Sequence, residues 1–206
     1  MNRQEIVIIE TGVANTASVC AAFKRLDLTP VLSADPARIV DSRLLVLPGV
    51  GSFGAGMKRL TELGVVEHIR ERIRQRRPLL SICLGFQMLF ESSTESPGVG
   101  GISALPGRFE PFSEQVRSPQ FGWNSVQPGE NCVLLKPGYA YFANSFRLQQ
   151  PPEGWRISCS THGGPFVAAV ESGPVLGCQF HPELSGRWGD ELLNSWLSRS
   201  QETAAC

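Results

Sequence analysis

Four short, nearly unbroken apolar stretches constrain the fold of this chain more than any other feature. They lie at residues 6–9, 44–47, 78–82 and 175–180 of a 206-residue sequence, and turn residues or charged segments bound them. An apolar run of this length without polar alternation is typical of a parallel strand that is buried on both faces. The sequence therefore predicts a sheet that is covered on both sides.

Segments with helical periodicity alternate with these runs. Apolar residues recur at the spacing of one helix face over residues 19–26, 65–73 and 192–197, and residues 85–90 can start a further helix. Strands that alternate with helices indicate a parallel sheet with right-handed crossovers. We therefore expect an α/β fold with a mainly parallel, open sheet and helices on both faces.

The second half of the chain has a different texture. Between about residues 98 and 175, Gly and Pro separate short strand-like segments at 139–142, 155–159 and 166–170. This pattern predicts hairpins, and so an antiparallel extension of the sheet. The chain has the usual length of one domain and contains no internal repeat or obvious linker. We expect a single domain over residues 1–206.

Composition excludes several classes of protein. The 19 Lys and Arg balance the 19 Asp and Glu, so there is no overall field for nucleic acid or anionic lipid. Only 18% of residues are charged and 42% are hydrophobic, which excludes disorder and fits a chain with a partner interface. No apolar run approaches the ~18 residues of a membrane span, and the first residues do not resemble a signal peptide. We expect a cytoplasmic location.

The cysteines are even in number but scattered. They are Cys20, Cys83, Cys132, Cys159, Cys178 and Cys206. Their spacing does not resemble a disulfide framework, and nothing indicates secretion. In a reducing compartment such cysteines are mostly small core residues, and one of them can be a nucleophile.

Cys83 carries the strongest local signal. It stands where a predicted strand turns into a predicted helix, with the small residues Ser81 and Gly85 two positions to either side. This is the pattern of a nucleophile elbow, in which a sharp turn exposes the nucleophile above the sheet edge. A helix that starts there would also favour the thiolate form of the side chain. A buried structural cysteine at the end of a core strand is the alternative interpretation.

The end of the last predicted strand supplies a second signal. His181 and Glu183 follow it, and residues two apart in an extended segment share a face. A carboxylate on one ring nitrogen leaves the other free to act as a base toward Cys83. All three groups would lie at carboxyl ends of strands, where open α/β sheets place their sites. A surface histidine with an incidental acid neighbour is the alternative.

Three motifs around these residues carry a family resemblance. They are LPGVG at residues 47–51, ICLGFQ at 82–87 and QFHPE at 179–183. Together they resemble the class I, or triad, glutamine amidotransferases. The resemblance implies that family's fold and its use of L-glutamine as substrate.

Three further motifs narrow the resemblance. They are TGVAN at residues 11–15, GWN at 122–124 and YFANSF at 141–146. They look like the glutaminase subunits of imidazole glycerol phosphate synthases, which serve histidine biosynthesis. The likeness runs from about residue 6 to the last helix. It implies a heterodimer with a cyclase barrel that receives ammonia, and no cofactor or metal.

The resemblance also implies roles for individual residues. Cys83 would attack the carboxamide of glutamine, His181 would shuttle protons, and Glu183 would orient His181. The backbone N–H groups of Leu84 and Val50 would stabilise the oxyanion. The remaining matched positions would bind substrate, at Gly49, Gly51, Gln87, Ser145 and Phe146, or contact the partner, at Trp123 and Asn124.

The chain departs from the family pattern at four positions. Ser81 replaces a common Gly before the elbow, and Phe86 replaces a frequent Met. Gln120 and Asn144 stand where the pattern usually has His. We expect the first two changes to be tolerated and the last two to affect coupling to the partner or the bound substrate.

Two other motifs suggest different chemistry. Residues 49–54 match G-x-G-x-x-G, but a dinucleotide site also needs an acidic strand end, and the nearest acid, Glu71, lies in a helical pattern. Residues 159–162 and 178–181 each read C-x-x-H, which suggests zinc. On extended strands such pairs face opposite sides, so we expect both cysteines in the core.

The chain also contains a run of basic residues between positions 70 and 77. It consists of Arg70, Arg72, Arg74, Arg76 and Arg77, interspersed with glutamates. We interpret it as the solvated face of a helix, with His68 also on the surface.

Two alternative functions remain open at this level. The same glutaminase chemistry could serve a different ammonia-using synthase. The chain could also be an amidotransferase-like interaction module without activity.

Overall fold

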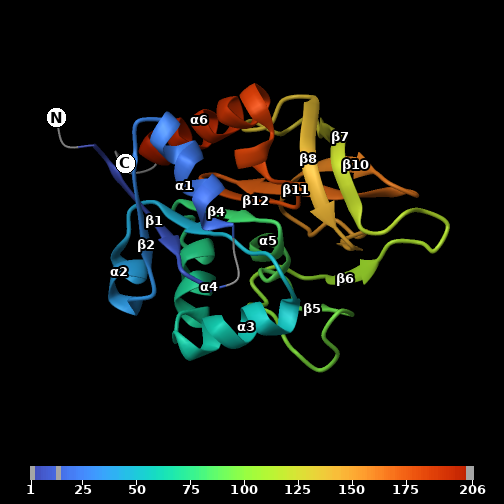
Figure 1. Ribbon diagram of the computed structural model, residues 1–206, viewed down its shortest axis with the longest axis horizontal. Helices are drawn as coiled ribbons and strands as arrows, with labels where there is room; N and C mark the ends of the chain where they lie inside the picture. The colour runs from blue at the N-terminus through green and yellow to red at the C-terminus, as the bar shows by residue number, and fades with distance from the viewer. Residues whose placement is uncertain (1–2, 13–14, 203–206) are drawn as a thin grey trace.

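The computed structural model describes residues 3–12 and 15–202. Val13 and Ala14 of the 11–15 motif, and Cys206, lie outside the described residues. The fold is built on a nine-stranded sheet whose two halves differ in strand direction (Figure 1). The parallel half comprises β2 (Thr29–Ser33), β1 (Glu5–Ile9), β3 (Leu45–Leu47), β4 (Leu79–Ile82) and β12 (Val175–Cys178), in spatial order. The antiparallel half continues from β12 with β11 (Pro165–Ser172), β10 (Arg156–Thr161), β7 (Gln120–Pro128) and β8 (Gly138–Asn144).

Helices cover both faces of the parallel half, as predicted (Figure 1). They are α1 (Thr16–Arg25) and α6 (Gly186–Glu202) on one face, and α3 (Phe53–Glu62) and α4 (Val66–Arg74) on the other. In β1, Ile6 and Ile8 join the core cluster of the first face, and Val7 and Ile9 join that of the second. This alternation explains why the whole strand reads as one apolar run.

Several elements lie beyond what the apolar patterns predicted. They are β2, α2 (Pro36–Asp41), α3, β7 and a small sheet of β5 (Ser92–Ser93), β6 (Arg108–Pro111) and β9 (Phe146–Arg147). β2 and β7 are partly exposed, so their sequences alternate or mix polar residues. The helix expected from residue 85 is the single turn α5 (Leu84–Gln87).

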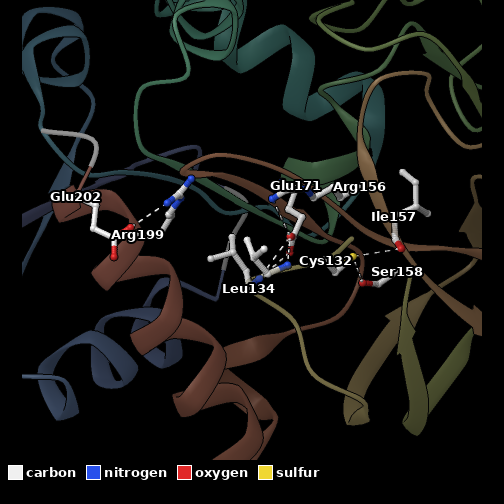
Figure 2. A network of polar contacts seen from close by, with 9 residues as sticks. Cys132, Leu134, Arg156, Ile157, Ser158, Glu171, Arg199 and Glu202 are labelled. Carbon is white, nitrogen blue, oxygen red and sulfur yellow. Dashed lines mark hydrogen bonds and ion pairs between the residues drawn. The ribbon is translucent and has the colours of Figure 1, made fainter. Parts of the chain in front are cut away.

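The loop between β7 and β8 is held by a buried carboxylate. Glu171 in β11 is 1% exposed, and its oxygens accept hydrogen bonds from the backbone N–H groups of Val133 at 2.5 Å and Leu134 at 3.1 Å. Figure 2 shows this carboxylate pointing toward the loop backbone, with Arg156 of β10 beside it. The β7–β8 loop is therefore fixed to β11, within the antiparallel half, by charge-assisted hydrogen bonds.

Two expectations about burial were wrong. Cys159 is exposed, because it lies on the solvent side of β10, whereas Cys178 is fully buried as expected. Arg72 is buried at 2% exposure although we placed it on a solvated helix face; His68 is exposed as expected. Among the described residues, no helix is both long and apolar enough to cross a membrane.

Candidate active site

Cys83 lies at a strained turn between β4 and α5. Its φ is 54° and its ψ is −109°, a conformation that costs free energy for a residue with a side chain. The turn is tight because α5 packs directly on the end of β3. A Cβ added at Gly85 would lie 2.0 Å from the carbonyl oxygen of Leu47, and one at Gly49 would lie 2.8 Å from the Gly85 nitrogen. The predicted elbow is therefore present, and its glycines are required by close backbone contact.

The two departures nearest the elbow fit their surroundings. The Ser81 side chain is buried, and its hydroxyl donates a hydrogen bond to the Leu176 carbonyl at 3.4 Å. The Phe86 ring is buried in edge-to-face contact with Phe90 and Phe109, at centroid distances of 5.1 and 5.7 Å. Each residue therefore has a satisfied environment, and neither disturbs the turn.

His181 and Glu183 form a buried pair. The ring nitrogen Nδ1 lies 2.8 Å from the Oε1 atom of Glu183. The residues meet through the 3₁₀ turn η1 (Pro182–Leu184) and not along an extended segment as we expected, because Pro182 starts the turn directly after His181. The predicted contact between His181 and Glu183 is present, but a 3₁₀ turn and not an extended segment brings the two side chains together. Glu183 thereby fixes the ring and leaves Nε2 available on the other side.

The electrostatics of this pair favour a charged imidazole. Burial alone lowers the pKa of His181, but hydrogen bonds with Cys83 and Glu183 and the negative charge on both partners outweigh it. The net effect raises the pKa of His181 to about 10. The site is therefore suited to hold a protonated imidazole between Cys83 and Glu183.

These groups open into a cavity of about 310 Å³ at the carboxyl edge of the parallel strands. The sequence-predicted residues that line it are Val50, Gly51, Cys83, Leu84, Gln87, Ser145, Phe146 and His181. Glu183 lies behind His181. Gly49 does not line the cavity, since it packs against α5.

The predicted oxyanion donors are not both directed at the cavity. The N–H of Leu84 donates to the carbonyl oxygen of Gly49 at 3.2 Å. That oxygen and the N–H of Val50 belong to the same peptide group. Rotation of this one peptide would free the Leu84 donor and reverse the direction of the Val50 N–H. Gly49 and Gly51 flank the segment, and Gly51 already has a φ of 96°.

Gln179 is a candidate functional residue to which the sequence patterns assigned no role. It is fully buried, its Nε2 atom lies 3.8 Å from the Cys83 sulfur, and its Oε1 atom accepts a hydrogen bond from Gln87 at 2.9 Å. A predicted substrate residue, Gln87, therefore contacts the thiol through Gln179. The sequence signal that could have identified it is a polar glutamine within the otherwise apolar run at residues 175–180, where the QFHPE motif begins.

Glu95 is a second missed candidate. It lines the cavity, and its Oε2 atom accepts a hydrogen bond from the Phe53 N–H at 2.6 Å. The neighbouring Ser96 hydroxyl accepts from the Gly54 N–H at 2.9 Å. These side chains occupy the amino end of α3, which a nucleotide phosphate would need under the G-x-G-x-x-G interpretation. Nothing in the local sequence predicted this contact.

The C-x-x-H pairs do not converge. The Cys178 sulfur points to the Ser81 carbonyl at 3.6 Å, and the His162 ring contacts the Arg117 carbonyl at 2.8 Å. Among the described residues, no cluster of three or more His, Cys, Asp or Glu is suited to a metal ion.

Trp123 and Asn124 lie outside the catalytic cavity. They line a neighbouring cavity of about 380 Å³ on β7, and Phe121 lines both cavities. The rings of Phe121, Trp123 and Tyr139 are 69%, 58% and 64% exposed. This aromatic face of β7 and β8 is the largest exposed group of aromatic side chains among the described residues.

Gln120 and Asn144 connect the two cavities. They are paired directly across β7 and β8, and both are buried. Asn144 lines the catalytic cavity, and Gln120 lines the neighbouring one. Both amide atoms of Gln120 and the Oδ1 atom of Asn144 have no hydrogen-bond partner in the described part of the chain.

Comparison with known proteins defines the class. The family model for "Glutamine amidotransferase class-I" matches residues 7–198. The chain belongs to the class I glutamine amidotransferase family. A crystal structure of glutamine amidotransferase has the same fold, with a TM-score of 0.76 at 19% identity over 95% of this chain and 99% of that one. The structure of PurLQS from Thermotoga maritima gives 0.70 at 18% identity, over 96% and 99%.

Curated relatives point to one kind of member. The chain is 35% identical to the imidazole glycerol phosphate synthase subunit HisH of Symbiobacterium thermophilum, over 93% of this chain and 92% of that protein. The subunit of the same name from Streptococcus sanguinis is 35% identical, over 97% and 99%. That from Thermobifida fusca is 37% identical, over 94% and 97%.

Proposed function

We propose that this chain is the glutaminase subunit of an imidazole glycerol phosphate synthase. It hydrolyses L-glutamine to glutamate and ammonia, and it passes the ammonia to a cyclase partner in histidine biosynthesis. The family membership and the HisH relatives support this assignment. The observation that carries the chemistry is that Cys83 and His181 line one cavity, with Glu183 2.8 Å from the His181 ring.

In the proposed first half-reaction, the Cys83 sulfur attacks the side-chain carbonyl carbon of glutamine. A C–S bond forms, the C–N bond of the carboxamide breaks, and His181 gives its proton to the departing nitrogen. Glu183 keeps the ring oriented and balances its charge. Well-placed proton transfer of this kind contributes roughly 10²–10⁴-fold to the rate.

In the second half-reaction, water attacks the glutamyl thioester. His181 accepts a proton from the water and the C–S bond breaks, which releases glutamate and returns the sulfur as a thiolate beside protonated His181. Both steps pass through an oxyanion, so both need the N–H donors of Leu84 and Val50, each worth about 3–4 kcal/mol. We propose that the Gly49–Val50 peptide rotates to form this pair of donors when the partner is docked.

A negatively charged side chain in the cavity can bind the ammonium group of the substrate. Glu95 is the one carboxylate among the described residues that line the cavity, so we assign it to the ammonium group of L-glutamine. Its Oε2 atom is already fixed by the Phe53 N–H, so the carboxylate is oriented before substrate binds. Gln87, Gly51, Ser145 and Phe146 complete the substrate pocket.

The exposed aromatic face of β7 and β8, with Trp123 and Asn124, is the proposed cyclase interface. It adjoins the catalytic cavity through Phe121, so ammonia would be released beside the partner. The chain would act as one domain over residues 1–206 and form a heterodimer. The five described cysteines are free thiols, which supports a reducing compartment such as the cytoplasm.

The test is a glutaminase assay with and without the cyclase subunit and its nucleotide ligand. We expect slow glutamate release from the chain alone, a large increase with the liganded partner, and no release from Cys83→Ala. Rapid turnover that the partner does not change would contradict the coupled function. Co-purification with a different synthase would favour the alternative pathway, and glutamate release undiminished in Cys83→Ala would overturn the proposed chemistry.

A further inference from the structure

Two residues of the arginine run, Arg72 in α4 and Arg77 just after its end, differ from their neighbours in what they contact. Arg70 and Arg74 each form a salt bridge with a glutamate of the same helix, as a solvated face would. Arg72 and Arg77 have no carboxylate partner in the part of the chain that the structure describes. Both point instead toward the end of α2 and the start of β3.

Arg72 is buried, with only 2% of the residue exposed. Its Nε atom donates to the Pro78 carbonyl at 2.9 Å, and Nη2 donates to the carbonyls of Ser42 and Arg43 at 2.9 and 3.0 Å. Nη1 has no hydrogen bond to any described residue. A buried cation normally requires an anionic partner, and carbonyl dipoles offset only part of its desolvation cost.

Arg77 adds a second positive charge at the same place. Its Nη2 atom donates to the carbonyls of Val40 and Ser42 at 3.1 and 3.2 Å, so two guanidinium groups share the Ser42 oxygen. Burial, and then the nearby charge of Arg77, lower the pKa of Arg72 to about 9. Arg72 therefore stays charged at neutral pH, and no carboxylate of the described residues pairs with it or with Arg77.

Both arginines line a cavity of about 210 Å³, together with His68 and Gln75. Glu71 is the one carboxylate among the described residues of this lining. Its two oxygens are taken by Arg74 and Gln75, with contacts of 2.5–2.6 Å. The cavity therefore offers nitrogen donors and an uncompensated positive charge. It lies at the amino edge of the sheet, beside Leu45 of β3, away from Cys83.

We propose that this cavity is a binding site for a phosphate group, held by Nη1 of Arg72 and by Arg77. Guanidinium groups match the geometry of phosphate oxygens, and charge-assisted hydrogen bonds of this kind are strong. His68 and Gln75 supply further polar contacts at the rim. The ligand is inorganic phosphate or a small phosphomonoester. The site is independent of the glutaminase proposal.

Calorimetric titration at constant ionic strength tests the site, with inorganic phosphate and glycerol phosphate as probes. We expect saturable binding with one site per chain, and binding that is equal in Cys83→Ala. Arg77→Gln should weaken it at least tenfold, the effect of losing about 1.4 kcal/mol. Arg74→Gln removes the same charge three residues away, at the end of α4 and outside the cavity lining, and should change affinity less than twofold.

A second variant separates binding from folding. Arg72→Lys keeps the charge but loses the planar fork, and we expect weaker phosphate binding with a cooperative thermal transition retained. Tighter binding of the ester would identify a phosphorylated metabolite as ligand, and preference for inorganic phosphate would identify the free ion. Equal affinity in Arg77→Gln and Arg74→Gln, or no saturable heat up to tens of millimolar phosphate, would overturn the proposal.

Discussion

The two halves of the nine-stranded sheet differ in burial and in the functional residues that they carry. The parallel half is buried on both faces in β3, β4 and β12, and it carries Cys83 and His181 at its carboxyl edge. The antiparallel half, from β11 to β8, leaves Trp123 and Tyr139 exposed and carries no proposed triad member. We therefore propose that the buried half holds the chemistry and that the exposed aromatic face of the antiparallel half contacts the partner.

Replacement of Glu183 by Gln gives the largest expected effect and tests the parallel half. The amide cannot hold His181 in the charged, oriented state, so kcat for glutamate release should fall roughly 10⁴-fold. Steady-state kinetics with the partner present measure it. Glu153→Gln, the same change at an exposed residue between β9 and β10 that lines neither cavity, is the matched control. A fall of less than tenfold in Glu183→Gln would show that the pair does not work as proposed.

Substitutions of two glycines, one in each half of the sheet, compare the two halves through their effects on the free energy of unfolding. Gly85→Ala would place a Cβ 2.0 Å from the Leu47 carbonyl, so we expect a loss of about 3 kcal/mol in the free energy of unfolding. Gly122 in β7 has a φ of 115° but open space around it, so Gly122→Ala should cost only about 1–2 kcal/mol of backbone strain. Urea denaturation measures both.

Gly100→Ala is the control for these variants, since Gly100 has neither a crowded neighbour nor a positive φ. It should change stability by no more than about 0.5 kcal/mol. Equal losses in Gly85→Ala and Gly122→Ala would remove the distinction between a crowded parallel edge and an open antiparallel strand.

Some of these elements and contacts could be predicted from the sequence alone, and others could not. The four parallel strands other than β2 and the Cys83 elbow were predictable, because a strand buried on both faces has an unbroken apolar run and a tight turn needs small residues. The η1 turn between His181 and Glu183 was not, since i and i+2 contact can arise from more than one backbone. The contacts of Glu95 and Arg72 depend on segments 30–42 residues away, which no local pattern encodes.

Replacement of Trp123 by Ala tests the antiparallel half. The exposed ring is a proposed anchor for the cyclase, and loss of such an anchor costs at least ~1.4 kcal/mol, so partner affinity should fall about tenfold or more. Glutamate release by the isolated chain should stay within twofold. Titration of the partner into each variant measures the affinity. A variant with unchanged affinity would place the interface elsewhere.

The pH dependence of stability tests the charge state of His181. The pKa of a free His is near 6.5 and that of His181 is raised to about 10, so the folded state binds the proton more tightly. Its stabilising effect is therefore complete below about pH 6.5 and is lost as pH rises through about 10. The stability advantage of the wild type over His181→Asn should shrink across this window. An advantage that grows with pH would reverse the assigned sign.

The smallest expected effect concerns Gln120 and Asn144. They face each other across β7 and β8, and cross-strand polar pairs contribute roughly 0.2–1 kcal/mol. A double-mutant cycle with Gln120→His and Asn144→His should give a coupling energy in that range, both in stability and in partner-stimulated activity. Strict additivity would show that the two positions act separately.

The formation of a glutamyl thioester on Cys83 is the most direct test of the central claim. Wild-type chain with its partner is mixed with L-glutamine, quenched in acid during turnover, digested and examined by mass spectrometry. We predict the added mass of one glutamyl group on the peptide that contains Cys83, and none on the peptides of Cys20, Cys132, Cys159 or Cys178. Glutamate release without any modified Cys83 peptide, together with undiminished turnover in Cys83→Ala, would contradict the account.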